Sequence, residues 1–482
     1  MSRPRPRIAA LLVAAAMVAA LGAAPAVHAA STIYVGPGGG TGGCAAPAFA
    51  TIAAGVAAAA DGDTVHVCAG TYALTESVYI ERSLALVGDG APTTIIVGHE
   101  GNLIIVAPSW RQTLSFAGLT FRHTQVGYGA SIRLRDFFGN VTVSDCTFNG
   151  DDVAYVRGIE AFGADLAITR STFTGYGAGQ WGTEGGAIYH EMGRLTVVDS
   201  TFTGNHATVG GAIWAGDRVS ISGSTFSGNS ATGGGGAISG VDLTITNSTF
   251  SGNTAGISGG AIATGGGSIT NSTFSGNGGV EPGAGGAVSA AYALTIANSI
   301  FSGPARQCLG PIVDAGGNVA TDPYCRGRLA SAAQIALGPL ASNGGPTQTM
   351  ALGPTSVALE AGVNAICAAS PVSGRDQRGV VRPQGPRCDA GAVEVLPGPT
   401  SGVVIDLVSP AAGKVGSTVT LTGFGFAYAS AVTFNGVPAA FSVRSPSAIV
   451  ATVPVGATTG PIRVTTRFRL SGASQNSFVV LP

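Results

Sequence analysis

Two adjacent carboxylates are the residues whose type and spacing come closest to acid–base chemistry. They are Asp151 and Asp152, which follow Asn149 and Gly150. Two carboxylates beside one glycosidic bond could protonate the leaving oxygen and activate a water molecule. Asp151, however, lies three residues after Phe148, and the same position of later repeats holds an asparagine. We therefore interpret both aspartates first as turn residues and second as candidates for catalysis.

Aromatic side chains offer a different chemistry, the stacking of a sugar ring against a flat hydrophobic surface. Such a strip would form if several of these residues pointed outward on one face: Trp110, Trp181, Trp214, Tyr176 and Tyr189. Trp214 directly follows Ile213, an inward residue of a repeat, and so is expected to point outward. It is our candidate ligand-binding residue.

The cysteines and histidines lack the spacing of a metal or redox site. The histidines are scattered along the chain, and no two cysteines have the short spacing of a zinc site. We predict neither a metal site nor a cofactor. Neighbours in sequence suggest three disulfides, which are Cys44 with Cys68, Cys308 with Cys325, and Cys367 with Cys388. The seventh cysteine, Cys146, falls in a column of serines and is interpreted as a packing residue.

A repeat of about 25 residues must position all of these side chains. Its phenylalanines stand at Phe121, Phe148, Phe173, Phe202, Phe226, Phe250, Phe274 and Phe301, each with an apolar residue five positions earlier. Apolar and polar residues alternate before each phenylalanine, as in a strand with one buried face. Asparagines three residues after four of these phenylalanines, at Asn205, Asn229, Asn253 and Asn277, would stack as a ladder of amides. The period suits three short strands per turn of a parallel β-helix.

Residues 31 to about 110 resemble the opening of the pectin-lyase-like right-handed β-helix family. The resemblance rests on Phe49-Ala50-Thr51-Ile52, the helix-compatible run from Gly55 to Ala60, Asp61 to Val67, Gly70-Thr71-Tyr72, and Leu84 to Gly88. It implies a right-handed β-helix over residues 31–303, with a short helix covering the first coil. A cover is needed because an open end exposes strand edges.

Within the repeats, two motifs alternate, as at Phe202-Thr203-Gly204-Asn205 and Gly210-Gly211-Ala212-Ile213. Over residues 185–290 they resemble the repeats of chlamydial polymorphic outer membrane proteins, which implies surface exposure and adhesion. Gly150-Asp151-Asp152 resembles a segment of polygalacturonases, a family that uses paired carboxylates. Neither the Asn-Thr-Asp nor the Gly-His-Gly motif of that family accompanies it.

The remainder of the chain divides into a segment over 304–394, a linker over 395–402 and a module over 403–482. Residues 339–394 resemble the choice-of-anchor Q domain, through Gly344-Gly345-Pro346-Thr347, Asp376-Gln377-Arg378-Gly379 and Cys388-Asp389-Ala390-Gly391-Ala392. We expect Asp376, Arg378, Asp389 and Glu394 to form ion pairs over the C-terminal end of the β-helix.

The C-terminal module resembles the immunoglobulin-like IPT/TIG domain. The matching residues are Ser409-Pro410, Gly416 to Phe426, Val432 to Val437, and Val453-Pro454 to Pro461-Ile462, with a hairpin turn at Asn435-Gly436. The predicted fold class is therefore all-β, a right-handed parallel β-helix followed by an immunoglobulin-like β-sandwich.

The first 30 residues have the basic start, apolar stretch and small-residue cleavage site of an export signal. A formal net charge of −1 with 10% charged residues gives no electrostatic footprint for nucleic acid. No membrane-spanning segment is expected after removal of the signal.

These observations favour a secreted or surface-associated bacterial binding and adhesion scaffold without catalysis. Its partner would be a polysaccharide or a surface protein. The alternatives are a lyase or hydrolase acting on acidic polysaccharide, and a structural spacer of the cell envelope.

Overall fold

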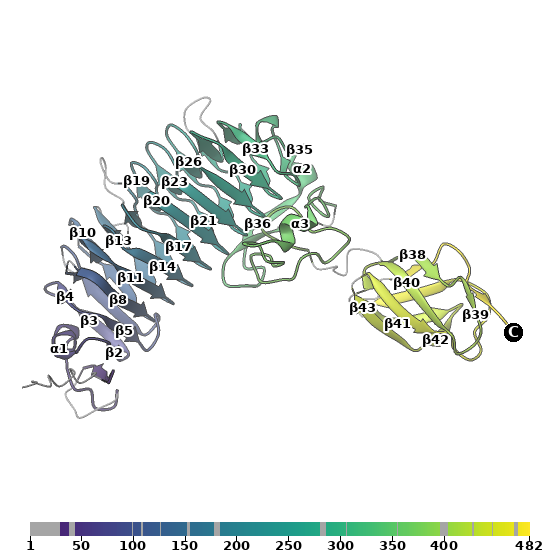
Figure 1. Ribbon diagram of the computed structural model, residues 1–482, viewed down its shortest axis with the longest axis horizontal. Helices are drawn as coiled ribbons and strands as arrows, with labels where there is room; N and C mark the ends of the chain where they lie inside the picture. Colours follow the sequence, from purple (N-terminus) through teal and green to yellow (C-terminus); the bar gives the residue numbers. More distant parts are fainter. Residues whose placement is uncertain are drawn as a thin grey trace, which may run out of the picture.

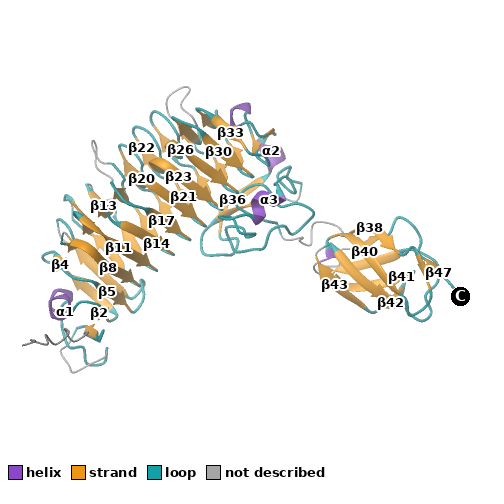
Figure 2. Ribbon diagram, viewed as in Figure 1, coloured by secondary structure: helices purple, strands orange, loops and turns teal. Residues whose placement is uncertain are grey.

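The computed structural model describes residues 29–37, 44–98, 100–107, 109–125, 127–151, 155–177, 184–279, 286–304, 306–353, 355–395, 403–426, 429–445, 447–466 and 471–482. The expected export signal and linker lie almost entirely outside these residues, as do Asp152 and Trp181. The described chain forms a right-handed parallel β-helix followed by an immunoglobulin-like β-sandwich (Figure 1). Nearly all of its regular structure is β-strand (Figure 2).

Each coil of the β-helix contributes strands to three faces, because apolar side chains recur on three short segments of every repeat. The first face consists of β4 (Val78–Ile80), β7 (Ile104–Val106), β10 (Gly129–Leu134), β13 (Val156–Ala161), β16 (Ile188–His190), the beginnings of β20 (Ile213–Ser222), β23 (Ile238–Thr246) and β26 (Ile262–Thr270), then β29 (Val288–Ala290) and β32 (Cys308–Leu309). The second face consists of β1 (Thr32–Val35), β2 (Asp63–Val67), β5 (Leu84–Gly88), β8 (Ser109–Ala117), β11 (Phe137–Ser144), β14 (Asp165–Thr169), β17 (Leu195–Val198), the ends of β20, β23 and β26, then β30 (Leu294–Ala297) and β33 (Ile312–Asp314).

The third face carries the recurring phenylalanines. It consists of β3 (Gly70–Ala73), β6 (Thr94–Gly98), β9 (Thr120–His123), β12 (Thr147–Asn149), β15 (Thr172–Thr174), β18 (Thr201–Thr203), β21 (Thr225–Ser227), β24 (Thr249–Ser251), β27 (Thr273–Ser275), β31 (Ile300–Ser302), β34 (Val319–Ala320) and β35 (Arg328–Leu329). Two-residue strands β19 (His206–Ala207), β22 (Ser230–Ala231), β25 (Thr254–Ala255) and β28 (Gly278–Gly279) pair beside it. Parallel pairing continues to Leu329, so the coils extend beyond the boundary at 303 suggested by the loss of the sequence period.

Stacked side chains fill the interior of the β-helix. The phenylalanine rings from Phe121 to Phe301 stack in one file with centroids 4.4–4.9 Å apart, close to the spacing of strands in a sheet. The expected amide ladder is present, since Nδ2 of Asn205, Asn229 and Asn253 each donates to Oδ1 of the next asparagine at 2.9 Å. Buried polar groups are thereby satisfied from one coil to the next.

A second ladder consists of small polar residues. The Ser171 hydroxyl accepts a hydrogen bond from the Cys146 backbone N–H at 3.2 Å. The Ser200 hydroxyl accepts one from the Ser171 backbone N–H at 3.1 Å. Burial raises the pKa of the Cys146 thiol to about 12. Cys146 is therefore an inert packing residue of this column.

Helix α1 (Ile52–Ala58) covers the N-terminal end of the stack and packs against β1, β2 and β4 (Figure 1). It begins three residues before the run expected from the sequence, because the Thr51 side chain accepts a hydrogen bond from the Ala54 backbone N–H at 3.2 Å and caps the first turn. None of the described helices has the length and hydrophobicity needed to cross a membrane.

After the last coils come the 3₁₀-helix η1 (Pro323–Cys325), α2 (Ala332–Ile335), the hairpin β36 (Leu337–Ala341) with β37 (Thr349–Leu352), and α3 (Asn364–Ala368). Residues 343–395, which we call the flank segment, lie along the side of the β-helix. Thr347 Oγ1 donates to the Gly223 carbonyl at 2.7 Å, and Thr249 Oγ1 donates to Gln377 Oε1 at 2.6 Å. The expected ion pair between Asp376 and Arg378 is present, but the segment that carries it reaches back along the side of several coils as well as toward the C-terminal end. Its resemblance to the choice-of-anchor Q domain stays a prediction.

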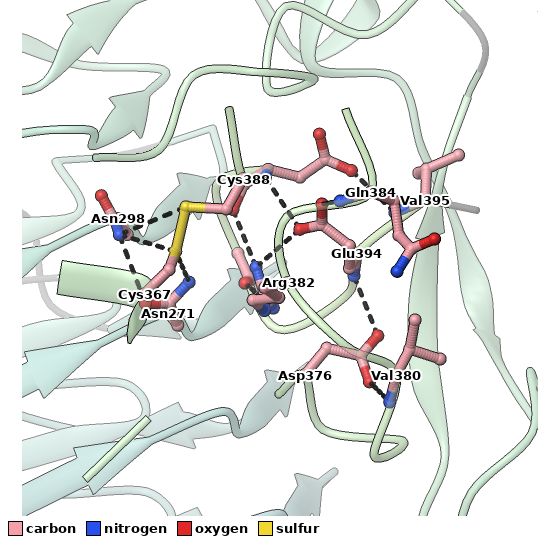
Figure 3. Close-up of polar contacts among 12 residues, drawn as sticks. Asn271, Asn298, Cys367, Asp376, Val380, Arg382, Gln384, Cys388, Glu394 and Val395 are labelled. Atoms are coloured by element: carbon pink, nitrogen blue, oxygen red, sulfur yellow. Dashed lines mark hydrogen bonds and ion pairs between the residues drawn. A yellow bond between two sulfur atoms is a disulfide. The ribbon is translucent and has the colours of Figure 1, made fainter. Parts of the chain in front are cut away.

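Ion pairs and a disulfide hold the flank segment together (Figure 3). Arg378 Nη2 lies 2.7 Å from Asp376 Oδ2, and Arg382 Nη1 lies 3.4 Å from Glu394 Oε2. Arg382, which the sequence interpretation did not include, also donates to the Asp389 and Gly391 carbonyls at 2.8 Å each. Burial and the neighbouring Asp389 raise the pKa of Glu394 to about 7.

Three disulfides join neighbours in sequence, Cys44–Cys68, Cys308–Cys325 and Cys367–Cys388, which are the pairs suggested by their proximity in the chain. They tie the first coil, the last coils and the flank segment, respectively. Disulfides of this kind persist in oxidising compartments.

The sandwich packs two antiparallel sheets around its own core. One sheet contains β38 (Val404–Ser409), β40 (Thr418–Phe424), β44 (Ala448–Thr452) and β43 (Phe441–Ser445), and the other contains β42 (Val437–Ala439), β41 (Ala429–Phe434), β45 (Ile462–Thr466) and β46 (Ser471–Ala473). Strands β39 (Ala412–Gly413) and β47 (Val479–Val480) pair in parallel. Asn435 and Gly436 both have positive φ, as the expected two-residue hairpin turn between β41 and β42 requires.

Candidate functional site

One column of outward side chains on the first face changes character along the β-helix axis. In register across the strands it runs Arg133, Glu160, Tyr189, Trp214, Ser239, Ala263 and Ser289. Each member follows an isoleucine or valine that is fully buried, which fixes the member outward by strand alternation. The column is charged at one end, aromatic in the middle and small at the other end.

The two aromatic members stack on each other. The rings of Tyr189 and Trp214 have centroids 4.7 Å apart and planes inclined by 9°, and Phe162 tilts against Tyr189 at 5.4 Å. Gly216 lets the chain pass close to the previous coil, since a Cβ there would lie 2.5 Å from the Glu191 carbonyl oxygen and 3.3 Å from Trp214 Cη2. Tyr189 covers one side of the indole, so the opposite side faces the next coil.

The next coil leaves space against that free side. Its member of the column is Ser239, followed by Gly240, and the coil after it has Ala263. A depression of about 250 Å³ results, lined by Trp214, Ala215, Ser239, Gly240, Val241, Ala263, Thr264 and Gly265. None of these lining residues is charged. The aromatic ladder therefore ends in an open slot beside Trp214.

The charged end of the column supports the aromatic part. Glu160 lies between two guanidinium groups, with Oε2 3.2 Å from Arg133 Nε and Oε1 3.6 Å from Arg157 Nη1. The Arg157 guanidinium carbon lies 5.1 Å from the centroid of the Tyr189 ring, and Arg157 Nε donates to the Glu184 carbonyl at 3.1 Å. Burial lowers the pKa of Arg157. Glu160 is thus bound in an ion-pair network that orients Tyr189, which leaves it poorly placed to act as a base.

The acid–base candidates lie elsewhere. Asp151 has φ of +48° in the turn after β12 on the third face, and its carboxylate accepts a hydrogen bond from Arg122 Nε of the preceding coil. Its backbone N–H donates to Asn149 Oδ1 at 2.9 Å. Asp152 lies outside the described residues. The structure therefore places Asp151 in an ion-paired turn and brings no second described carboxylate into an ion pair with Arg122.

Of the other aromatic candidates, Tyr176 is in the core. It is buried, its hydroxyl lies 3.1 Å from Ser131 Oγ, and burial raises its pKa. Tyr176 therefore does not contribute to an outward aromatic strip, and its backbone N–H donates to Asn205 Oδ1 at the start of the amide ladder. The side chain of Trp110 and the whole of Trp181 lie outside the described structure.

The histidine and cysteine groups offer no open metal site in the described part of the chain. His190 is buried, with Nε2 2.8 Å from the Ala164 carbonyl, and burial lowers its pKa. Cys44, Cys68 and Asp89 come close together, but the two cysteines form a disulfide and so present no thiolate.

The sequence analysis included Tyr189 and Trp214 in one possible aromatic strip, but it did not identify their direct stacking or the ion-pair network beside Tyr189. The signal was available for Tyr189, since it follows Ile188 as Trp214 follows Ile213 in the same motif. No comparable signal marked Arg157, whose role depends on its contacts with Tyr189 and Glu184 of the next coil.

Comparisons with known proteins support the two folds. Residues 132–301 match the family described as right handed beta helix region, and residues 404–479 match the IPT/TIG domain. These two domain types fit a surface binding scaffold. No curated protein matches the chain.

Among solved structures, an auxiliary nutrient binding protein from Bacteroides ovatus is 22% identical over 17% of this chain and 22% of its own, with a TM-score of 0.17. A PL6 family alginate lyase is 13% identical over 64% of this chain and 40% of its own, with a TM-score of 0.35. The ORF18 protein of Geobacillus virus E2 is 11% identical over 89% of this chain and 75% of its own, with a TM-score of 0.32. The chain spans only about a fifth of the length of the nutrient binding protein, and these likenesses carry no argument about function.

Proposed function

We propose that this protein is a secreted or surface-associated binding scaffold that holds a polysaccharide by stacking one sugar ring on Trp214. The observation that carries the proposal is the free side of the Trp214 indole, which faces a depression where the aromatic ladder stops. The C–H face of a pyranose ring would continue the ladder on a π-surface with a negative face. Tyr189, Arg157 and Glu160 would hold the indole in place from the other side.

The size and lining of the depression favour a single neutral ring. Its volume of about 250 Å³ is smaller than that of pockets for drug-sized ligands, whose volumes begin at about 300 Å³. Its lining has no guanidinium or carboxylate group that would pair with a charged sugar. The depression is shallow, so the binding of a polymer would depend on contacts repeated along the chain of sugars.

The rest of the chain is compatible with display outside the cell. Three disulfides support an oxidising compartment, and β-sandwich modules of the IPT/TIG type serve many proteins as spacers or partner domains. Glu160 and Asp151 are both ion-paired, so these two carboxylates are poorly placed to act as an acid or base on the bound ring.

The test is binding of the purified mature chain to neutral and acidic polysaccharides by affinity electrophoresis, followed by calorimetry with oligosaccharides. We expect Trp214→Ala to weaken binding by about tenfold or more, since aromatic anchors dominate such contacts. Tyr79→Ala is the matched control, because Tyr79 is exposed on the same face, in register with the column but two coils before Arg133 and far along the axis from Trp214.

Two results would contradict the proposal. Release of oligosaccharide products from a polysaccharide would establish catalysis and favour the lyase or hydrolase alternative. Equal binding by the Trp214 and Tyr79 variants, or no binding by a folded protein to any polysaccharide, would favour another surface or a structural spacer.

A further inference from the structure

A second cavity lies at the C-terminal end of the β-helix, between the last coils and the flank segment. It has a volume of about 320 Å³, and the guanidinium-bearing residues Arg326, Arg328 and Arg387 line it together with Asp314 and Glu360. Three arginines from two separate parts of the chain thus converge on one cavity. This cavity belongs to neither the aromatic column nor the ion-pair network of Figure 3.

The three guanidinium groups are not neutralised by an ion pair. Within the described residues, none of Arg326, Arg328 and Arg387 has a carboxylate oxygen within 4.0 Å, whereas Arg378 and Arg382 of the same segment are each paired. The cavity holds three positive groups against two carboxylates. It therefore has a surplus of positive charge at neutral pH.

Hydrogen bonds to the flank segment position two of these side chains. Arg328 Nη1 donates to the Val357 carbonyl at 3.3 Å, while Arg387 donates through Nε to Gly362 at 3.0 Å and through Nη2 to Ala361 at 3.2 Å. A guanidinium has five N–H donors, so each retains donors for a ligand. Arg326 follows η1 directly, and the adjacent Cys325 is fixed by its disulfide to Cys308.

The two carboxylates of the cavity are engaged by other groups. Asp314 Oδ1 accepts hydrogen bonds from the Gly316 backbone N–H at 2.9 Å and from Asn318 Nδ2 at 2.6 Å. Glu360 Oε2 accepts the backbone N–H of Arg387. Burial raises the pKa of Glu360 and the nearby Asp389 adds to this, although the backbone N–H and the charge of Arg387 act in the opposite direction. The carboxylates therefore leave the arginine donors available.

We propose that this cavity binds an oxyanion, either the carboxylate of an acidic sugar or a sulfate or phosphate group. Arginine is suited to these groups because its planar fork of donors matches two oxygens at once. This site is separate from the neutral slot beside Trp214, so a polysaccharide with occasional anionic groups could contact both.

The test is calorimetric titration of the full mature chain at low ionic strength with galacturonate, inorganic sulfate and inorganic phosphate. The three probes separate carboxylate from tetrahedral anions. We expect the double variant Arg326→Gln, Arg328→Gln to bind the preferred probe at least about tenfold more weakly, as expected for lost charge-assisted hydrogen bonds. Arg463→Gln in the sandwich is the control and should bind like the unmodified chain.

A variant that is expected to strengthen binding keeps the test independent of folding defects, because a misfolded protein would bind more weakly. Glu360→Gln removes one negative charge at nearly constant size, so we expect it to bind the same probe several-fold more tightly at pH 7. The raised pKa of Glu360 predicts that binding to the unmodified chain also strengthens as the pH falls, because the carboxyl group becomes neutral. Glu360→Gln should abolish that pH dependence.

The proposal is wrong if no probe binds the folded chain at low ionic strength, or if the arginine variants bind as well as the Arg463 control. Neither outcome depends on Trp214, so the failure of this site and the failure of the sugar slot are distinguishable. Loss of the sugar slot alone would leave oxyanion binding intact.

Discussion

One turn position of the repeat has exposed or partly exposed side chains in the early coils of the β-helix and buried side chains in the later coils. Before β12, β15, β18, β24, β27 and β31 of the third face, the turn has one non-glycine residue in the left-handed region, with φ near +50°. In the early coils this residue is Asp145, Arg170 or Asp199, which are wholly or partly exposed, and in the later coils it is Asn247, Asn271 or Asn298, which are buried. The backbone is alike in both parts, and only the surroundings of the side chain differ.

The flank segment causes this difference. Asn298 Oδ1 accepts the Val363 backbone N–H at 2.8 Å, and Asn247 Nδ2 donates to the Arg375 carbonyl at 3.0 Å. The neighbouring threonines follow the same division, since Thr225, Thr249 and Thr273 are buried while Thr147, Thr172 and Thr201 are not. A repeated position that changes from charged to amide thus reports where another part of the chain covers the coil.

The largest loss of stability is expected from breaking the buried ion pair between Arg382 and Glu394 within the flank segment. Arg382→Met at pH 8, where Glu394 is ionised, leaves a buried carboxylate without its partner and should cost about 3–5 kcal/mol of unfolding free energy. Denaturant unfolding and limited proteolysis within residues 343–395 would measure the loss. Arg375→Met is the control, because Arg375 is exposed and makes one hydrogen bond to a carbonyl. Equal stability of the two variants would show that the buried pair does not hold the segment.

A smaller loss of stability is expected when an asparagine at a turn covered by the flank segment is replaced by the aspartate found at uncovered turns. Asn271→Asp places a carboxyl group in a fully buried turn next to Cys367, at a cost of about 1–3 kcal/mol at pH 7. Burial raises the pKa of such a group above its unfolded value. The cost is therefore absent at low pH and grows as the pH rises through the folded pKa.

The reverse exchange on the uncovered flank is the matched control for this prediction. Asp145→Asn removes only an exposed ion pair with Arg170, 2.7 Å long, and should change the unfolding free energy by at most about 1 kcal/mol. Its small cost should also be present at pH 7 and fade at low pH, because Arg170 lowers the pKa of Asp145, so the pair stabilises above the unfolded pKa and is lost as the pH falls through the folded pKa. Thermal unfolding at pH 4 and pH 7 would compare the two variants. Equal losses of unfolding free energy in Asn271→Asp and Asp145→Asn would contradict the role assigned to the flank segment.

The smallest change in stability is expected in the inward columns of the β-helix, which are buried with or without the flank segment. Cys146 is buried although its coil is on the uncovered flank, and burial raises its pKa to about 12. We expect no reaction with a thiol reagent at pH 8 in the folded protein and full reaction after denaturation. Cys146→Ser should change stability by less than about 1 kcal/mol, since Ser171 and Ser200 already fill this column. Rapid labelling of the folded chain would show that the column is open.

Part of the candidate site followed directly from the sequence. Trp214 points outward because it follows Ile213, and the amide ladder follows from asparagines at one offset from the phenylalanines. The orientation of Tyr176 stayed open in the sequence, because strand alternation says nothing about a residue beyond the end of β15. The slot beside Trp214 depends on small residues in two further coils, and its existence required the register of the strands.

The coil and its inward columns could be predicted from the sequence, because each coil contacts mainly its neighbours and those contacts recur with the period of the chain. The sandwich fold could be predicted from its resemblance to the IPT/TIG domain. The tertiary structure alone decided which flank is covered, where the buried ion pairs form and how three arginines meet. Those contacts join residues such as Gly223 and Thr347, 124 positions apart, which share no period. A single non-repeating contact between distant segments leaves no pattern that a reader of one sequence can recognise.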